Sequence, residues 1–210
     1  MSWATKLVKL IRDVFDEKIA DVHTHLPARV VSFDASLNTC SIQLCVKRIR
    51  TDDPNNLTYV ELPIIRDVPV HQFGSGKCLL SVSPQVDSYG SYHISERSIS
   101  RWIKEGGVTE PESFRKFDIS DGVFFPGIYP TVTDGDNGKL ASAILTDRVE
   151  LRTRTGDTTI SVLDNESVLV KTANTTVTID ENGSVSFDIP AGQTFKVKKG
   201  ATTYLQVTAS

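Results

Sequence analysis

The sequence lacks the features that mark a membrane-anchored or secreted protein. Its 210 residues contain no run approaching the roughly 18 consecutive apolar residues of a membrane-spanning helix. Segment 5–22 mixes acidic with basic residues, so it is not the apolar core of a signal peptide. We therefore expect the chain to be made and kept in the cytoplasm unless a larger assembly carries it out.

Cysteine is scarce, with three residues in the chain. Cys40 and Cys45 lie five positions apart in one predicted strand, so they point to opposite faces and make a poor disulfide or metal clamp. We predict that they are small buried hydrophobes in a reducing compartment.

Catalytic signatures are also missing. The sequence has no G-x-S-x-G nucleophile motif, and His71 and His93 have no evident catalytic partner. Glu110 and Glu112 flank Pro111, which favours a loop over the carboxylate-lined cleft of a glycosidase. We predict that the protein is not an enzyme and uses no cofactor.

The most regular feature present is the tail from about Asp147 to Ser210. Short apolar clusters alternate with polar residues at a period of two, and successive clusters begin 8 to 11 residues apart. Each cluster offers about two inward apolar residues, too little core for one chain, so we predict a β-helical rod built from several chains. The predicted inward residues are Val149, Leu151, Ile160, Val162, Val168, Val170, Val177, Ile179, Val185, Phe187, Phe195, Val197, Leu205 and Val207.

The N-terminus has helical periodicity. In segment 5–22 the residues Leu7, Ile11, Val14, Phe15 and Ile19 fall on one side of a predicted amphipathic helix. Such a helix needs a partner surface, which could be its own domain, a symmetry mate or a different protein. Its balanced charges make a membrane-surface helix the weaker interpretation.

Between these parts lies a β-rich head. The alternation pattern predicts a polar loop over 48–56, a short helix over 98–105 capped by Ser98, and irregular chain over 108–129. The expected strands are 29–34, 40–47, 57–64, 68–73, 78–82 and 86–94. This pattern suits a small closed barrel of the OB type.

From the residue patterns, the fold prediction is mostly β, with an N-terminal helix, an OB-fold barrel and a C-terminal β-helical rod built from more than one copy of the chain. Four parts are expected: a helix over 1–26, a head over 27–130, a neck over 131–146 and a shaft over 147–210.

Five segments of the head follow one another in a distinctive order. They are 25–34, the strand 41–46, Asp67-Val68-Pro69-Val70, Glu96 to Trp102, and Asp118 to Val123 followed by Pro126-Gly127. Together they resemble the N-terminal domain of the Gp138-type membrane-piercing spike proteins of contractile-tailed bacteriophages. The resemblance covers about residues 20–130 and rests on the order and spacing of the segments.

This resemblance implies an OB-fold head, a homotrimer and an intertwined β-helix mounted at the tail tip beneath a baseplate hub. Leu7, Ile11, Val14, Phe15 and Trp102 are then the expected contacts with the hub or another partner. The family often ends in a tip that holds iron through a His-x-His pair, but no histidine follows His93 here. We expect a separate protein to cap the C-terminal end.

Two site hypotheses compete with simpler interpretations. His23 and His25 have tolerable spacing for a metal, but they lie between helix and barrel, so we predict no metal site and keep them as weak candidates. An OB barrel can bind single strands, and Lys47, Arg48, Arg50 and Tyr59 are available, but no aromatic stacking ladder accompanies them. The net charge of −3 also argues against nucleic-acid binding.

The predicted function is mechanical: a virion protein at the baseplate tip that pierces the host outer membrane when the tail contracts, so that the viral genome can be ejected. The expected partners are two further copies of the chain, the hub, the cap and, transiently, the membrane. The alternative is an OB-fold binding module for single-stranded nucleic acid or glycan, with the β repeats as a spacer.

Overall fold

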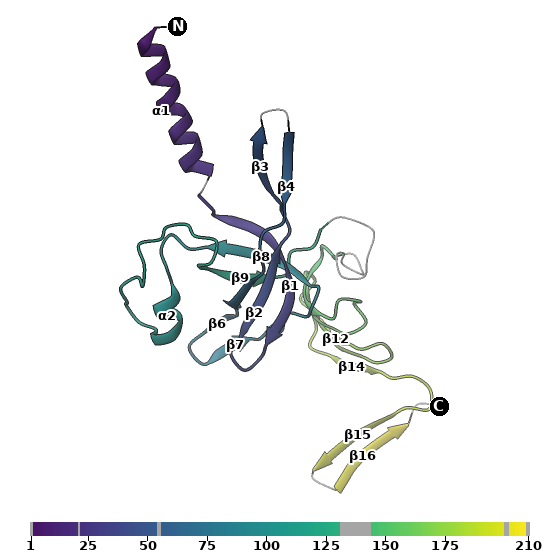
Figure 1. Cartoon of the computed structure of the whole chain (residues 1–210). Coiled ribbons are helices and arrows are strands. Elements are labelled where there is room, and N and C mark those ends of the chain that lie inside the picture. Colours follow the sequence, from purple (N-terminus) through teal and green to yellow (C-terminus); the bar gives the residue numbers. More distant parts are fainter. Residues whose placement is uncertain (1, 21, 54–55, 131–143, 200–201, 209–210) are drawn as a thin grey trace. The chain divides into compact units, whose positions relative to one another are not determined.

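A computed structural model describes residues 2–20, 22–53, 56–130, 144–199 and 202–208 (Figure 1). The chain divides into two compact units, Met1–Lys139 and Leu140–Ser210. Most of the expected neck, residues 131–143, lies outside the described residues. None of the helices in the described ranges is long and apolar enough to span a bilayer.

The first unit begins with helix α1 (Trp3–Ala20) and contains a second, short helix, α2 (Ser100–Glu105). Its strands are β1 (His25–Asp34), β2 (Thr39–Leu44), β3 (Arg48–Asp53), β4 (Asn56–Val60), β5 (Ile65–Pro69), β6 (Phe73–Ser75), β7 (Cys78–Leu80), β8 (Tyr89–Ile94) and β9 (Gly122–Pro126).

Five of these strands form one antiparallel sheet in the order β5-β2-β1-β8-β9. Along β2 buried residues alternate with half-buried ones, as expected of a strand with one face on the core. The sheet curls until its edges approach each other: Val70 bridges Phe124, and the His71 N–H donates to the Phe124 carbonyl at 2.8 Å. The result is a half-barrel. Its core consists of Ala28, Val30, Cys40, Ile42, Leu44, Ile65, Val68, Val70, Tyr92, Ile94 and Phe124.

Two glycines make room for the largest core side chains. A Cβ on Gly90 would lie 2.4 Å from the Phe124 ring, and a Cβ on Gly122 would lie 2.7 Å from the Tyr92 ring. Both rings are fully buried, and the Tyr92 hydroxyl donates to the Ile119 carbonyl at 3.0 Å. The close approach of aromatic ring and backbone therefore requires glycine at both positions.

Several sequence predictions for the head are wrong in detail. Within the segment 48–56, predicted as a polar loop, Arg48–Asp53 form β3, which pairs with β4 and places Ile49 opposite Tyr59. The segment 108–129 contains β9, which pairs with β8. Cys40 is buried as predicted, but Cys45 is exposed just beyond the end of β2.

The predicted cap of the short helix is also wrong. Helix α2 begins at Ser100, and Ile99 occupies the cap position without a side-chain hydrogen bond. The Ser98 hydroxyl instead donates to the buried carboxylate of Asp121 at 3.0 Å, because that acceptor lies beside it in the folded head.

The second unit is an antiparallel meander followed by a hairpin. Its first five strands are β10 (Arg148–Arg152), β11 (Thr159–Leu163), β12 (Val168–Lys171), β13 (Thr176–Ile179) and β14 (Val185–Asp188), hydrogen-bonded in sequence order. Strands β15 (Thr194–Lys199) and β16 (Thr202–Thr208) pair with each other. Tight turns join the strands: Asp180 accepts the N–H groups of Asn182 and Ser184, and Gly183 takes a positive φ of 81°.

The mostly β architecture with an N-terminal helix is thus confirmed. Closure of the head into a complete OB barrel and assembly of the tail into a trimeric β-helix stay predictions.

Candidate functional site

The candidate site is an apolar face on the sheet of the second unit. Cross-strand pairing places apolar residues opposite each other at each step from β10 to β14, so they share one face of the sheet. They form two parallel rows that cross all five strands. The first row is Val149, Val162, Val168, Ile179 and Val185, and the second is Leu151, Ile160, Val170, Val177 and Phe187.

The terminal hairpin continues this surface. Phe195 pairs with Val207, and Val197 pairs with Leu205. The rings of Phe187 and Phe195 lie 4.7 Å apart, so the hairpin and the sheet contact each other through apolar side chains. We call the two rows and the four hairpin residues the shaft face. It contains all fourteen residues for which the sequence predicts an inward orientation.

The shaft face is open to solvent in the single chain. Val149 is 78% exposed, and even Val170 is 40% exposed. The half-buried members are Val168, Val177 and Phe195. Full burial of one such side chain stabilises a protein by about 1.5–3 kcal/mol, so the face represents a large unrealised contribution. A contiguous apolar surface of this kind marks an interaction site.

The opposite face of the same sheet is mostly polar, and over β10 and β11 it is better covered. Ser161 is fully buried and Thr159 is 7% exposed. Above them Glu150 lies 4.0 Å from Arg148 and 3.6 Å from Arg152, and its carboxylate accepts a hydrogen bond from the Ser161 hydroxyl at 3.4 Å. In an ordinary sheet with one buried face the apolar face is the covered one, whereas here the apolar face is the more exposed. A single chain covers the polar face over β10 and β11 and leaves most of the shaft face exposed.

A second exposed apolar surface lies on α1. Leu7, Ile11, Val14 and Phe15 are each at least 46% exposed. Trp102, on α2, is 51% exposed. The structure therefore leaves all the residues expected to contact a hub or partner accessible, and their partner stays a prediction.

The weak metal candidates, His23 and His25, have different neighbours. The His25 ring faces His93 across paired strands, with 4.9 Å between centroids, whereas His23 acts electrostatically on Asp118. Within the described ranges no group of three or more His, Cys, Asp or Glu side chains could hold a metal ion.

A row of rings across the head was missed by sequence reasoning. The His93 ring lies 4.4 Å from Phe125, which stacks on His71 at 4.3 Å. Burial, followed by the neighbouring His25 and His71, lowers the pKa of His93. The row depends on the registers of β1, β8 and β9, which no local sequence signal gives.

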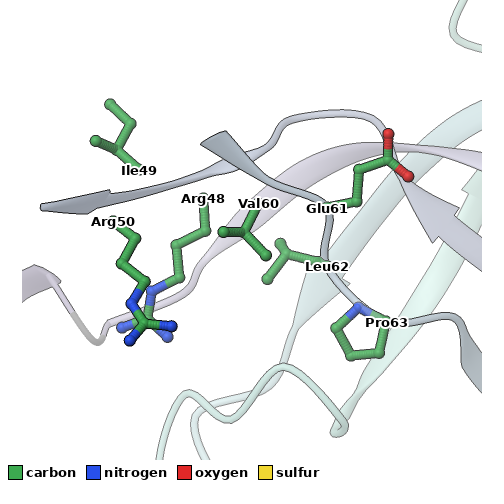
Figure 2. Close-up of a pocket in the computed structure, with 7 residues that line it drawn as sticks. All are labelled: Arg48, Ile49, Arg50, Val60, Glu61, Leu62 and Pro63. Carbon is green, nitrogen blue, oxygen red and sulfur yellow. The ribbon is translucent and has the colours of Figure 1, made fainter. Parts of the chain in front are cut away.

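One hollow of the head lies beside the β3–β4 hairpin. It has a volume of about 580 Å³, and Figure 2 shows Arg48 and Arg50 among the residues that line it. Tyr59 pairs with Ile49, one position out of phase with these arginines, so Tyr59 and the two arginines lie on opposite faces of the hairpin. Single-strand binding needs both on one face, which counts against the binding-module alternative.

One of the two glutamates considered for hydrolysis, and a buried aspartate of the head, have basic partners. Glu112 forms an ion pair with Lys104 at 3.7 Å on the surface. The buried Asp121 pairs with Arg115 at 3.1 Å and accepts from Ser98. Each of these two carboxylates therefore has a structural partner.

Comparison with known proteins identifies the head. Residues 26–127 match the family model described as the phage protein Gp138 N-terminal domain. The match spans the half-barrel sheet from β1 to β9 and includes α2. No curated protein matches significantly over the chain.

Proposed function

The chain is a Gp138-type phage protein, a virion-associated structural protein, and on that premise we propose that it is the central spike of a contractile tail. In this proposal three copies bring their shaft faces together into an intertwined β-helical rod. Tail contraction drives the rod through the host outer membrane. The half-barrel heads carry the rod beneath a baseplate hub.

The shaft face is the observation that carries this proposal. An isolated five-stranded meander in which eight of the ten apolar row residues are 40–78% exposed would be a poor stable unit, and its strands have only four or five residues. Three copies give each shaft face two apolar neighbours, which supports closure around a common axis. The strands of the sheet are too short to enclose a core alone.

A piercing rod requires stiffness rather than chemistry. Backbone hydrogen bonds between consecutive strands leave few unpaired groups, and closure around an axis leaves few edges from which the rod could unravel. The charged residues of the polar face would then form the outer surface. Arg148 and Glu150 are examples, and their mutual pairing suits passage of the rod through water and lipid headgroups.

Cryo-electron microscopy of the phage particle tests the assignment. Before contraction, the expected result is a three-fold density on the tail axis at its distal end, into which three shafts and three heads fit. Density for this protein in a peripheral fibre or along the tail tube would overturn the proposal. Its partners, the hub and the cap, would be identified in the same map.

A further inference from the structure

Helix α1 exposes a large apolar surface to solvent. Leu7 is the least exposed of its described large apolar residues, at 46%, and Trp3 is the most exposed, at 79%. A helix of 18 residues whose apolar side is open gains little stability from propensity alone. Its stability therefore depends on a surface that covers this side.

The positions of the apolar residues follow a heptad pattern. Ala4, Leu7, Ile11 and Val14 are spaced 3, 4 and 3 residues apart, which places them in one stripe, as at positions a and d of a coiled coil. The adjacent e and g positions as far as Phe15 are apolar too, and they are Trp3, Val8, Leu10 and Phe15. Beyond Phe15 the pattern weakens, because Glu17 takes the next g position and Ile19 falls at b. The b, c and f positions over the same turns are polar, namely Thr5, Lys6, Lys9, Arg12, Asp13 and Asp16.

The width of this surface indicates how many neighbours α1 contacts. A two-stranded coiled coil buries a narrow a/d seam, whereas apolar e and g positions widen the contact to roughly half of the helix. A helix in a three-fold bundle contacts two neighbours and can bury such a surface. The polar face carries Lys6, Lys9 and Arg12 against Asp13 and Asp16, so its charge is nearly balanced and gives little attraction to an anionic membrane.

We propose that the α1 helices of three copies associate as a parallel three-helix bundle, with Ala4, Leu7, Ile11 and Val14 along its axis. The inference rests on the trimer of the proposed function. Cyclic symmetry makes the three helices run in the same direction, so each residue of the stripe meets its own copies. Lys18 takes the next a position, where a charged residue fixes register at some cost in stability.

Association of the shafts would stabilise a helix bundle this short. Four apolar layers are marginal for free peptides, because helices of this length are barely stable in water. Chains already joined by their shafts present their α1 helices to each other at an effective concentration on the order of millimolar. The bundle would then join the three copies through their N-terminal helices.

Disulfide trapping in the full-length protein tests this arrangement. Cys45 and Cys78 are exposed and would be replaced by serine, whereas Cys40 can stay because burial raises the pKa of its thiol to about 12. Leu7→Cys then places a thiol on the axis, and Lys9→Cys, on the polar face, is the matched control. Only Cα atoms within about 7 Å can be bridged, so Leu7→Cys should form interchain disulfides at least about tenfold faster than Lys9→Cys.

Sedimentation of the same two variants under reducing conditions separates the outcomes. A trimer with rapid bridging at position 7 supports the bundle. A trimer in which both cysteines bridge equally slowly overturns the bundle and leaves the spike assignment standing; α1 would then cover a surface of the hub. A monomer overturns both.

Discussion

Tyr92 and Phe124 fill the interior of the half-barrel, and glycines give them the space. At the residue scale the sequence shows glycines in β-rich segments but not which ring lies over them. The pairing of Gly90 with Pro126 and of Gly122 with Ile94 decides this, and such registers are set by the folded sheet. Sequence reasoning consequently found the strands and missed the contact.

Gly90→Ala should destabilise the head. The added Cβ would meet the Phe124 ring and the Phe125 carbonyl at 2.4 Å, so the strands must separate or the ring must move. Overpacking of this kind costs about 1–3 kcal/mol. Chemical denaturation of the full chain measures the loss of stability. Gly76→Ala is not a suitable control, because the φ of 57° at Gly76 would strain an alanine. An unchanged midpoint would contradict the described packing.

The head should lose stability as the pH falls because of His93. Its pKa is lowered in the folded state by burial and by His25 and His71. A histidine whose pKa is lowered by folding binds protons more readily in the unfolded protein. Its contribution to the stability of the head is therefore fully present above the unfolded pKa of about 6.5, and it is lost as the pH falls toward the folded pKa.

We expect the melting temperature to fall between about pH 7.5 and pH 5.5, and to fall less in His93→Gln. Asp34 and Asp118 also have lowered pKa values, but they titrate below this window. Equal pH slopes for the two proteins would exclude His93 as the source.

At the element scale, period-two alternation predicted the tail strands well. The ten residues of the two rows fall on one face because each turn from β10 to β14 places apolar residues of one strand opposite apolar residues of the next. The alternation failed for Arg48–Asp53, whose polar composition indicated a loop. That segment forms β3 because β4 pairs with it in a hairpin. Ser98 likewise resembled a helix cap, whereas Asp121, distant in sequence, accepts its hydroxyl.

Two neighbouring substitutions in β13 test the shaft face. Val177 and Thr178 are both half-buried in the single chain, but Val177 lies in the apolar row and Thr178 lies on the polar face. If copies join through the shaft face, Val177→Asp buries an unpaired charge, which costs several kcal/mol, and should abolish the trimer. Thr178→Asp should leave it intact. Equal effects on the mass measured by light scattering would contradict an interface on this face.

At the scale of the whole molecule, the family resemblance and the apolar repeat lead to the same proposal from different residues. The head supplies the family, and the shaft face supplies the need for partners. The number of copies could not be predicted from the sequence or from a single chain, because an interface between identical chains is visible on each chain only as an exposed apolar surface. The three-fold stoichiometry is for this reason a proposal.

An interlocked trimer should resist heat and detergent. Separating it exposes three shaft faces at once, so unfolding should be cooperative and slow. We expect the trimer band to persist in unheated samples during gel electrophoresis in dodecyl sulfate and to disappear after boiling. Val177→Asp provides the matched sensitive variant. A trimer that dissociates in detergent at room temperature would contradict a stiff interlocked rod.

The mass of the purified full-length protein in solution tests the central claim most directly. Sedimentation equilibrium should give three times the chain mass of 23.1 kDa, about 69 kDa, at every concentration in the micromolar range. A mass of one chain, or one that falls steadily on dilution, would contradict a spike built by three copies closing their shaft faces around one axis.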